Sequence, residues 1–415
     1  MEAKKVSMSI TEKILAKASG KERVFPRDYE WVNADILMTH DPCTPGTIGV
    51  FKKEFGENAK VWNTEGHVMV PDHFVYTTDA NANRNLEIMR SFARKQKIKH
   101  FYDVFGPKYC GVCHSTLAEQ GHVLPGTVIF GTDSHTVMAG AFGAFATGIG
   151  NTDAAFVLGT GKLLIKIPFS NKYEFSGQMP SYLMAKDLIL HVLGKITTSG
   201  ATYRAMEFTG ETVDNLSAEE RMTMCNMAIE AGAKNGIMTP NQDSLEYVKQ
   251  RSNKKFQVFE SDQDAQYHEK HSFNTSKLEP AVAKPNSPDN LELAKNLSNI
   301  EVSQAYIGSC TGGKITDFKA VAKVLFGKKV KIPTFAVPAT KEVLRQIVEC
   351  KEKDKTIYQV LTQAGVTMSF EPSCAACCGG PKDTFGRMND EGTCISTTNR
   401  NFVGRMGNKN AEIYL

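Results

Sequence analysis

The sequence predicts an α/β protein whose largely parallel sheets surround a central cleft. Short apolar strands alternate along the chain with segments of helical periodicity, and this order is typical of parallel sheets. Six of the expected strands run directly into loops that carry His, Asp, Cys or Arg. Because ligands of parallel sheets bind beyond the carboxyl ends of the strands, these loops should meet in one cleft. A chain of 415 residues has room for two to four globular domains.

The expected strands are short and apolar, as buried strands of parallel sheets usually are. They lie at residues 36–38, 68–70, 128–130, 305–307, 368–370 and 395–397. The stretch 257–290 is instead polar and contains three prolines, Pro280, Pro285 and Pro288. We therefore expect residues 257–290 to form a connection between domains.

The expected helices begin and end at recognisable residues. Ser9 and Glu12 have the spacing of a capping box, and Gly20 can end the helix that follows. A second capping box begins at Ser217 and opens a helix that we expect to run to about Gly232. Its apolar neighbours make Glu230 as well suited to a buried position as to an exposed one. Two further helices are predicted from one-sided apolar patterns, at residues 85–96 and 341–350.

Three cysteines have the pattern of a metal site that can act on a substrate. Cys374 and Cys377 are separated by two residues, and Cys310 lies far upstream between an apolar run and small residues. Thiolates favour zinc, copper or iron–sulfur clusters. A closed structural site needs four ligands, so three leave one position open for chemistry. The alternative is that these cysteines are buried apolar side chains, and we expect that role for Cys378.

A second cysteine pair permits two other hypotheses about the function of the protein. Cys110, Cys113 and His114 form a Cys-x-x-Cys-His sequence, which is typical of covalent haem attachment. The same pair could form a thioredoxin-like redox centre. The absence of an export signal argues against haem attachment, and the size of the chain argues against a thioredoxin-like domain. Both remain alternative hypotheses.

Composition limits the partners of the protein. The formal net charge of +4 is spread over the chain, so no obligatory nucleic-acid partner is expected. No apolar run is long enough to span a membrane, and residues 1–21 lack the apolar core of a secretory signal. We expect an intracellular, cytoplasmic protein, or one in a plastid or other organelle if a transit peptide has been removed. In that setting, ten cysteines favour metal binding or reduced thiols over disulfides.

Four longer motifs resemble the aconitase family, and the resemblance runs nearly end to end. They are Gly131-Thr132-Asp133-Ser134-His135-Thr136, Ile307-Gly308-Ser309-Cys310-Thr311-Gly312-Gly313-Lys314, Gly379-Gly380-Pro381-Lys382-Asp383 and Asn399-Arg400-Asn401-Phe402-Val403-Gly404-Arg405. The resemblance implies the aconitase-type fold of three α/β domains, which we place at residues 1–168, 169–295 and 296–415. The sequence departs from the family at Cys378, where relatives commonly have an aliphatic residue. This departure leaves two alternatives to a packing role for Cys378: an alternative ligand, or an oxidation-sensitive neighbour of the site.

The resemblance also implies a cofactor and a reaction. One [4Fe–4S] cluster per chain would be held by Cys310, Cys374 and Cys377. Within the family the chain is most similar to enzymes of leucine biosynthesis that interconvert 2-isopropylmalate and 3-isopropylmalate through an alkene. The reaction is a dehydration followed by rehydration and needs no redox change. Homocitrate, citrate and methylated malates have the same 2-hydroxy di- or tricarboxylic acid core and remain alternative substrates.

Roles for individual residues follow from the same resemblance. The acid that protonates the departing hydroxyl would be His73 paired with Asp72, and imidazole suits this task near neutral pH. The other catalytic groups would be His114 with Asp133, and His135 with Glu230. Residues expected to bind the substrate are His40, Ser134, Arg400 and Arg405, and those expected to line the cluster are Asn226 and Asn399.

The resemblance implies that a second polypeptide completes the site. The dehydration needs a base for the proton on the neighbouring carbon, and none of the motifs above supplies one. In the aconitase family this base is a serine on a mobile fourth domain. The similarity is to two-chain enzymes, so we expect that domain on a separate small subunit.

Overall fold

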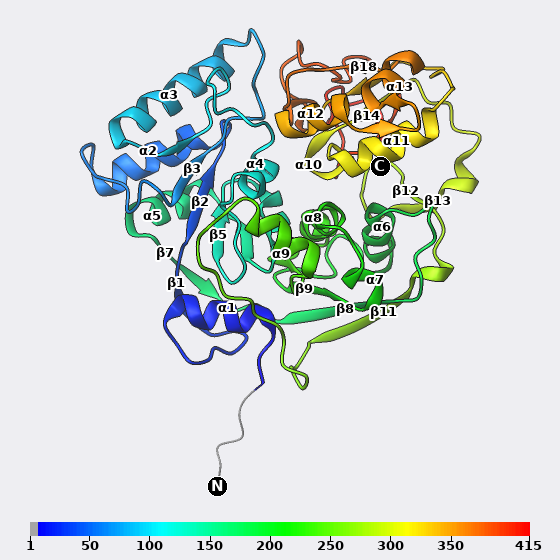
Figure 1. Ribbon diagram of the computed structural model, residues 1–415. Helices are drawn as coiled ribbons and strands as arrows, with labels where there is room; N and C mark the ends of the chain where they lie inside the picture. Colours follow the sequence, from blue (N-terminus) through cyan, green and yellow to red (C-terminus); the bar gives the residue numbers. More distant parts are fainter. Residues whose placement is uncertain (1–6) are drawn as a thin grey trace.

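The computed structural model, which describes residues 7–415, contains three parallel sheets with helices packed around them (Figure 1). Two of the sheets have five strands and one has four. Every strand pair within them is parallel. The α/β class predicted from the alternation of strands and helices is therefore confirmed. The division at residues 168 and 295 remains a prediction.

The first sheet has the strand order β4-β3-β2-β5-β6. Every residue of β2, β3 and β5 is buried, because helices cover these strands. The strands predicted at 36–38, 68–70 and 128–130 are thus present to within one residue. The bounds are β2 (Ile36–Thr39), β3 (His67–Met69), β4 (His100–Phe101), β5 (Val128–Gly131), β6 (Phe145–Gly148), α2 (Thr44–Phe55), α3 (Ala80–Gln96), α4 (Cys113–Glu119), η1 (Ser134–Phe142) and α5 (Asn151–Thr160). Helix α3 starts five residues before the predicted segment, where Asp79 caps it.

The amino-terminal helix has the predicted ends. In α1 (Ile10–Ser19) both bonds of the Ser9–Glu12 capping box are formed, and Gly20 ends the helix with a φ of 71°. Next along the chain is β1 (Tyr29–Asn33), which pairs antiparallel with β7 (Lys162–Lys166).

The second sheet has the order β10-β9-β8-β11, and its edge strand corrects one prediction. Residues 257–290 are not merely a connection, because β11 (Glu269–Asn274) pairs along its whole length with β8. The strand was hidden because only Phe273 among its side chains is buried. The remaining bounds are β8 (Ser170–Ser176), β9 (Ala205–Thr209), β10 (Asn235–Ile237), α6 (Ala185–Ile196), α7 (Glu211–Asp214), α8 (Ala218–Asn226), η2 (Met227–Ala231), α9 (Gln242–Lys249), η3 (Thr275–Lys277), β12 (Ala281–Ala283), β13 (Leu291–Leu293) and η4 (Ala294–Leu297).

The helix predicted from Ser217 to Gly232 has the right ends and an irregular middle. Its capping box is formed, and Gly232 adopts a φ of 78°. After Asn226 the α-helix tightens into the 3₁₀ helix η2. Asn226 and Glu230 are both buried. Of the buried and exposed positions that the sequence allowed for Glu230, the structure has the buried one.

The third sheet has the order β18-β15-β14-β19-β20. Its strands and helices include those predicted near residues 305, 341, 368 and 395. The bounds are β14 (Gln304–Ile307), α10 (Ser309–Gly312), α11 (Ile315–Leu325), β15 (Thr334–Ala336), α12 (Lys341–Glu349), β16 (Lys351–Glu352), β17 (Lys355–Thr356), α13 (Ile357–Ala364), β18 (Thr367–Met368), η5 (Ala375–Cys378), β19 (Thr393–Ser396) and β20 (Glu412–Tyr414).

The loop before α4 joins the first sheet region to the third. The Val112 amide donates to the Ala339 carbonyl at 2.8 Å, and the Lys341 amide donates to the Cys110 carbonyl at 2.7 Å. Gly111 permits this approach, since a Cβ there would lie 2.2 Å from the Ala339 oxygen. The contact brings His114 on α4 toward the cysteine loops of the third sheet.

The same junction contains a carboxyl whose ionisation should destabilise the fold. Glu119, at the end of α4, accepts a hydrogen bond from the Thr340 hydroxyl at 2.7 Å. Burial raises the pKa of Glu119 to about 7. The unfolded chain ionises this group at a lower pH, so folding stability is lost as the pH rises from about 4.5 to about 7.

We therefore expect Glu119→Gln to stabilise the protein more at pH 8 than at pH 5. The gain at pH 8 should be ~1–3 kcal/mol, because a neutral amide keeps the hydrogen bond without a buried charge. Scanning fluorimetry at the two pH values would measure the difference in Tm. Glu54→Gln, on an exposed side chain, is the control and should change neither value. Equal Tm shifts at pH 5 and pH 8 for Glu119→Gln would contradict the prediction.

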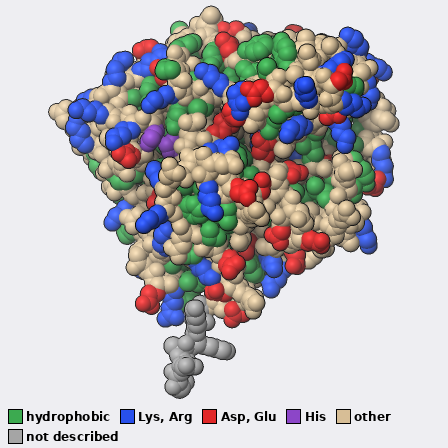
Figure 2. All heavy atoms as spheres, in the orientation of Figure 1, with side chains coloured by type: hydrophobic (Ala, Val, Ile, Leu, Met, Phe, Trp, Pro, Cys, Tyr) green, Lys and Arg blue, Asp and Glu red, His purple; other side chains and the backbone are tan. Residues whose placement is uncertain are grey.

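The surface carries both signs of charge. Figure 2 shows Lys and Arg side chains interspersed with Asp and Glu over one face of the molecule. Among residues 7–415, none of the helices has both the length and the apolar character needed to cross a membrane.

Candidate functional site

The three predicted ligand cysteines lie together in the interior. Cys310 follows β14 in α10, and Cys374 and Cys377 follow β18 at η5. Each is no more than 4% exposed. Interaction with the Cys374 thiol lowers the pKa of Cys310 well below its usual range and that of Cys377 to about 6. Interaction with Cys310 and Cys377 raises the pKa of Cys374. The Cys374 thiol therefore lies beside both other thiols.

Amide and guanidinium groups point at these sulfur atoms. The Cys310 sulfur accepts hydrogen bonds from Asn226 Nδ2 at 3.1 Å and Asn399 Nδ2 at 3.3 Å. Arg405 Nη2 approaches the Cys377 sulfur at 3.9 Å. N–H donors stabilise the thiolate, which is the form that binds metals. Asn226 and Asn399 thus both lie against the Cys310 sulfur, and their role as cluster-lining residues stays a prediction.

Unpartnered polar atoms around the three cysteines are a second observation that favours an iron–sulfur cluster at this place. Three polar atoms around the cysteines are buried without a hydrogen-bond partner among the described residues: His114 Nδ1, Tyr306 OH and Arg405 Nε. Buried polar atoms without a protein partner are rare, and a bound polar group at this place would satisfy these three. A set of three soft thiolates with polar neighbours suits a cluster with one open iron position.

Cys378 differs from the three cysteines before it. Burial raises the pKa of its thiol to about 12, and its sulfur faces the Cys374 and Ala375 carbonyls at 3.5 and 3.4 Å. A protonated thiol that points at carbonyl oxygens is a packing group, and we keep Cys378 outside the proposed ligand set.

Asp133 is the centre of the histidine cluster. Its carboxylate accepts a bond from His114 Nε2 and another from the His135 amide, both at 2.7 Å. The Nε2 atoms of His73 and His40 lie 3.6 and 3.8 Å from it. Burial alone would raise the pKa of Asp133, but the histidines, His114 above all, hold it well below its usual range. The carboxylate is therefore ionised at neutral pH.

His73 is held as a cation by its neighbour. Its Nδ1 lies 2.7 Å from Asp72 Oδ1. Burial favours neutral His73, yet Asp72 raises its pKa well above the usual value. His40 stacks against His73 edge-on, with ring centroids 4.6 Å apart, and burial lowers the pKa of His40.

Sequence reasoning missed the role of Asp41. Its carboxylate accepts the backbone N–H groups of Asp72, His73 and Phe74 at 2.7–2.9 Å. It thereby fixes the turn that presents His73. The sequence feature that could have indicated this role is the position of Asp41 directly after His40, at the end of a predicted strand.

Glu230 links His135 to Arg400. His135 Nε2 lies 2.8 Å from Glu230 Oε1, and Arg400 Nε lies 2.9 Å from both Glu230 oxygens. Burial and Arg400 lower the pKa of His135, but Asp133 and Glu230 raise it to a net value of about 9. Among residues 7–415, the terminal nitrogens of Arg400 donate to no protein group. The guanidinium therefore keeps donors for a ligand.

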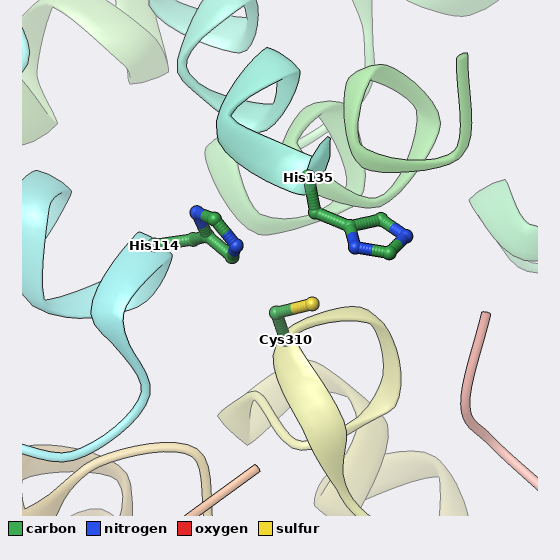
Figure 3. A group of neighbouring side chains, drawn as sticks. All are labelled: His114, His135 and Cys310. Carbon is green, nitrogen blue, oxygen red and sulfur yellow. The ribbon is translucent and has the colours of Figure 1, made fainter. Parts of the chain in front are cut away.

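Figure 3 shows how three of these side chains converge. His114 from α4, His135 from η1 and Cys310 from α10 point into one space. Their ligand atoms all lie within 4.8 Å of one another. Ser134 is half-buried at the start of η1 and directly precedes His135 in the sequence.

The Cys110–Cys113 pair lacks the properties of a redox centre. Burial raises the pKa of Cys110 to about 11 and that of Cys113 well above its usual value, whereas redox thiols have lowered pKa values. His114 faces Asp133, which gives it a partner other than a haem iron.

The fold and the site define a hydro-lyase of the iron–sulfur type. The family described as "Aconitase family (aconitate hydratase)" matches residues 12–294 and 289–415. The chain belongs to the aconitase family, whose members use a [4Fe–4S] cluster.

Curated relatives span nearly the whole chain. The chain is 53% identical to the chloroplastic 3-isopropylmalate dehydratase large subunit of Arabidopsis thaliana, over 99% of this chain and 83% of the relative. It is 40% identical to the 3-isopropylmalate dehydratase large subunit of Aquifex aeolicus, over 99% and 93%. It is 41% identical to a probable methanogen homoaconitase large subunit of Methanothermobacter thermautotrophicus, over 99% and 94%.

A solved structure supports the fold alone. The holo-form of aconitase X from Thermococcus kodakaraensis aligns with a TM-score of 0.51 at 13% identity, covering 94% of this chain and 89% of that one.

Proposed function

We propose that this chain is the large subunit of a two-chain hydro-lyase that interconverts 2-isopropylmalate and 3-isopropylmalate. The observation that carries the proposal is that Cys310, Cys374 and Cys377 gather next to the charged His73–Asp72 pair, where the Cys374 amide donates to the Asp72 carbonyl at 2.8 Å. The 53% identity to the Arabidopsis relative supports isopropylmalate as the substrate and leucine biosynthesis as the pathway. The 41% identity to a homoaconitase subunit keeps homocitrate as a second candidate.

The cofactor in this proposal is a [4Fe–4S] cluster held by the three cysteines. When bound, it supplies a Lewis acid that polarises the carbon–oxygen bond to be broken. Asn226 and Asn399 hold the Cys310 sulfur, and Arg405 places a positive charge beside Cys377. These groups favour the thiolate form of the ligands.

His73 supplies the proton for the departing hydroxyl. Asp72 keeps the imidazole protonated and fixes its orientation through Nδ1, so Nε2 carries the proton to be given away. After transfer, the neutral imidazole can accept a proton back from water during rehydration. Asp133 lies 3.6 Å from Nε2 and favours the return of the cation.

The substrate carboxylates bind to arginines in this proposal. Arg400 is fixed by Glu230 through Nε and keeps its terminal nitrogens for a carboxylate, and Arg405 lies beside the Cys377 sulfur. Ser134 and His40 complete the set of proposed substrate contacts. His135 and Glu230, which lie 2.8 Å apart, orient the reacting oxygen, and His114 forms a pair with Asp133 like that of His73 with Asp72.

A small subunit completes the site. The names of the relatives as large subunits support such a partner. We infer that it carries the mobile fourth domain, with the base that removes the carbon-bound proton. An intracellular location, in a plastid or the cytoplasm, agrees with ten unpaired cysteines and with the chloroplastic Arabidopsis relative.

The test is anaerobic reconstitution with iron and sulfide, followed by assays with and without the Arabidopsis small subunit. We expect turnover of 2-isopropylmalate only with both chains present. A panel of homocitrate, citrate and methylated malates at equal concentration gives the substrate preference. Full activity of this chain alone would exclude the partner, and turnover of homocitrate but not isopropylmalate would replace the proposed substrate.

A further inference from the structure

A lysine of the second sheet region reaches across to the third. Lys186 lies in the first turn of α6. The residue is half-buried, and its ammonium donates to the Thr398 carbonyl at 2.9 Å and the Ser396 carbonyl at 3.2 Å. Both carbonyls belong to the end of β19 and the loop after it. A lysine head among protein atoms needs such partners, because burying an unpaired charge is costly.

The loop held by Lys186 carries three proposed functional contacts. Asn399, the next residue after Thr398, donates to the Cys310 sulfur at 3.3 Å and to the Thr311 hydroxyl at 2.9 Å. Arg400 then binds Glu230. A shift of the Thr398 carbonyl would therefore displace two side chains together. One is Asn399, which donates to the Cys310 sulfur, and the other is Arg400, the proposed substrate contact.

The charge of Lys186 also lies near the cluster ligands. The charged groups around its ammonium are Asp317, Asp187, the Cys377 thiolate and Lys314. Burial lowers the pKa of Lys186 to about 8, so the ammonium remains mostly protonated at neutral pH. The ammonium therefore interacts favourably with a negative charge on Cys377.

We propose that Lys186 is a positioning residue of the iron–sulfur site, which it serves from helix α6 by fixing the loop of Asn399 and Arg400. The inference rests on the proposed function, since it presumes that Cys310 is a cluster ligand. Among residues 7–415, the Lys186 ammonium donates to these two carbonyls and to none of the ligand sulfurs. It acts on them through the two carbonyls of the loop.

The test compares Lys186→Met, Lys186→Arg and the control Lys195→Met in the reconstituted two-chain complex. Lys195 lies on the same helix α6 and is exposed. The main readout is the rate at which a chelator removes iron, followed by visible absorbance. We expect Lys186→Met to lose iron about 10–100-fold faster than the wild type, the range typical of lost outer-shell contacts to a metal site. Lys195→Met should match the wild type.

Two further measurements separate positioning from general loss of stability. Thermal unfolding of the chains without cluster should be nearly the same for Lys186→Met and Lys195→Met. Lys186→Arg, which keeps charge and donors, should recover most of the iron retention. For Lys186→Met we also expect a raised KM, since Arg400 follows the displaced loop.

The outcomes distinguish this inference from the proposed function. A wild type that holds no cluster would overturn the proposed function, and the inference with it. A wild type that holds its cluster, with Lys186→Met losing iron at the same rate and with an unchanged KM, would overturn the inference alone. The inference would also fail if Lys186→Arg behaved like Lys186→Met.

Discussion

Replacing Cys374 by alanine should abolish iron binding by the reconstituted chain. Its thiol lies beside those of Cys310 and Cys377, and a cluster held by three thiolates loses its closed ligand set when one is removed. We expect the same result for Cys310→Ala and Cys377→Ala. Iron per chain and the visible absorbance of the cluster measure the outcome.

Cys378→Ala is the matched control in the same turn. It removes a neighbouring thiol of equal size that points at the Cys374 and Ala375 carbonyls, so iron content should remain that of the wild type. Loss of iron in Cys378→Ala together with its retention in Cys374→Ala would show that the ligand had been chosen wrongly.

His73→Asn should lower kcat by ~10²–10⁴ while the cluster stays in place. Asparagine can still bond to Asp72 but has no proton to give, so the departing hydroxyl loses its acid. The measurement is kcat with 2-isopropylmalate in the two-chain complex, with iron content determined on the same sample. Kinetics like those of the wild type would place His73 outside the proton transfer.

The exposed His268 provides the control for the histidine prediction. His268→Asn, at the edge of the second sheet region, makes the same chemical change on an exposed side chain whose charged neighbour is Glu269, and it should leave kcat unaltered. Asp72→Asn should fall between the two variants, because the imidazole would remain while the group that keeps it protonated would be gone.

The local sequence was sufficient for most of the elements. The Ser9 and Ser217 capping boxes are formed, because a cap and its partner lie three residues apart and need no tertiary contact. Strands such as β2 and β5 were recognised because burial on both faces requires continuous apolar residues. β11 was missed for the opposite reason, since an edge strand can be polar and still pair its backbone.

The sequence by itself determined the kind of chemistry, through the cysteine spacing and the motifs around Asp133 and Arg400. Only the tertiary structure decided which groups touch. Glu230 and Arg400 are 170 residues apart in sequence, and Lys186 and Thr398 are 212 apart. The role of Asp41 at the Asp72 turn likewise depends on two strands lying side by side. Residue types and local spacing set what a group can do, whereas its partner and its pKa follow from burial and neighbours that the packed sheets bring together.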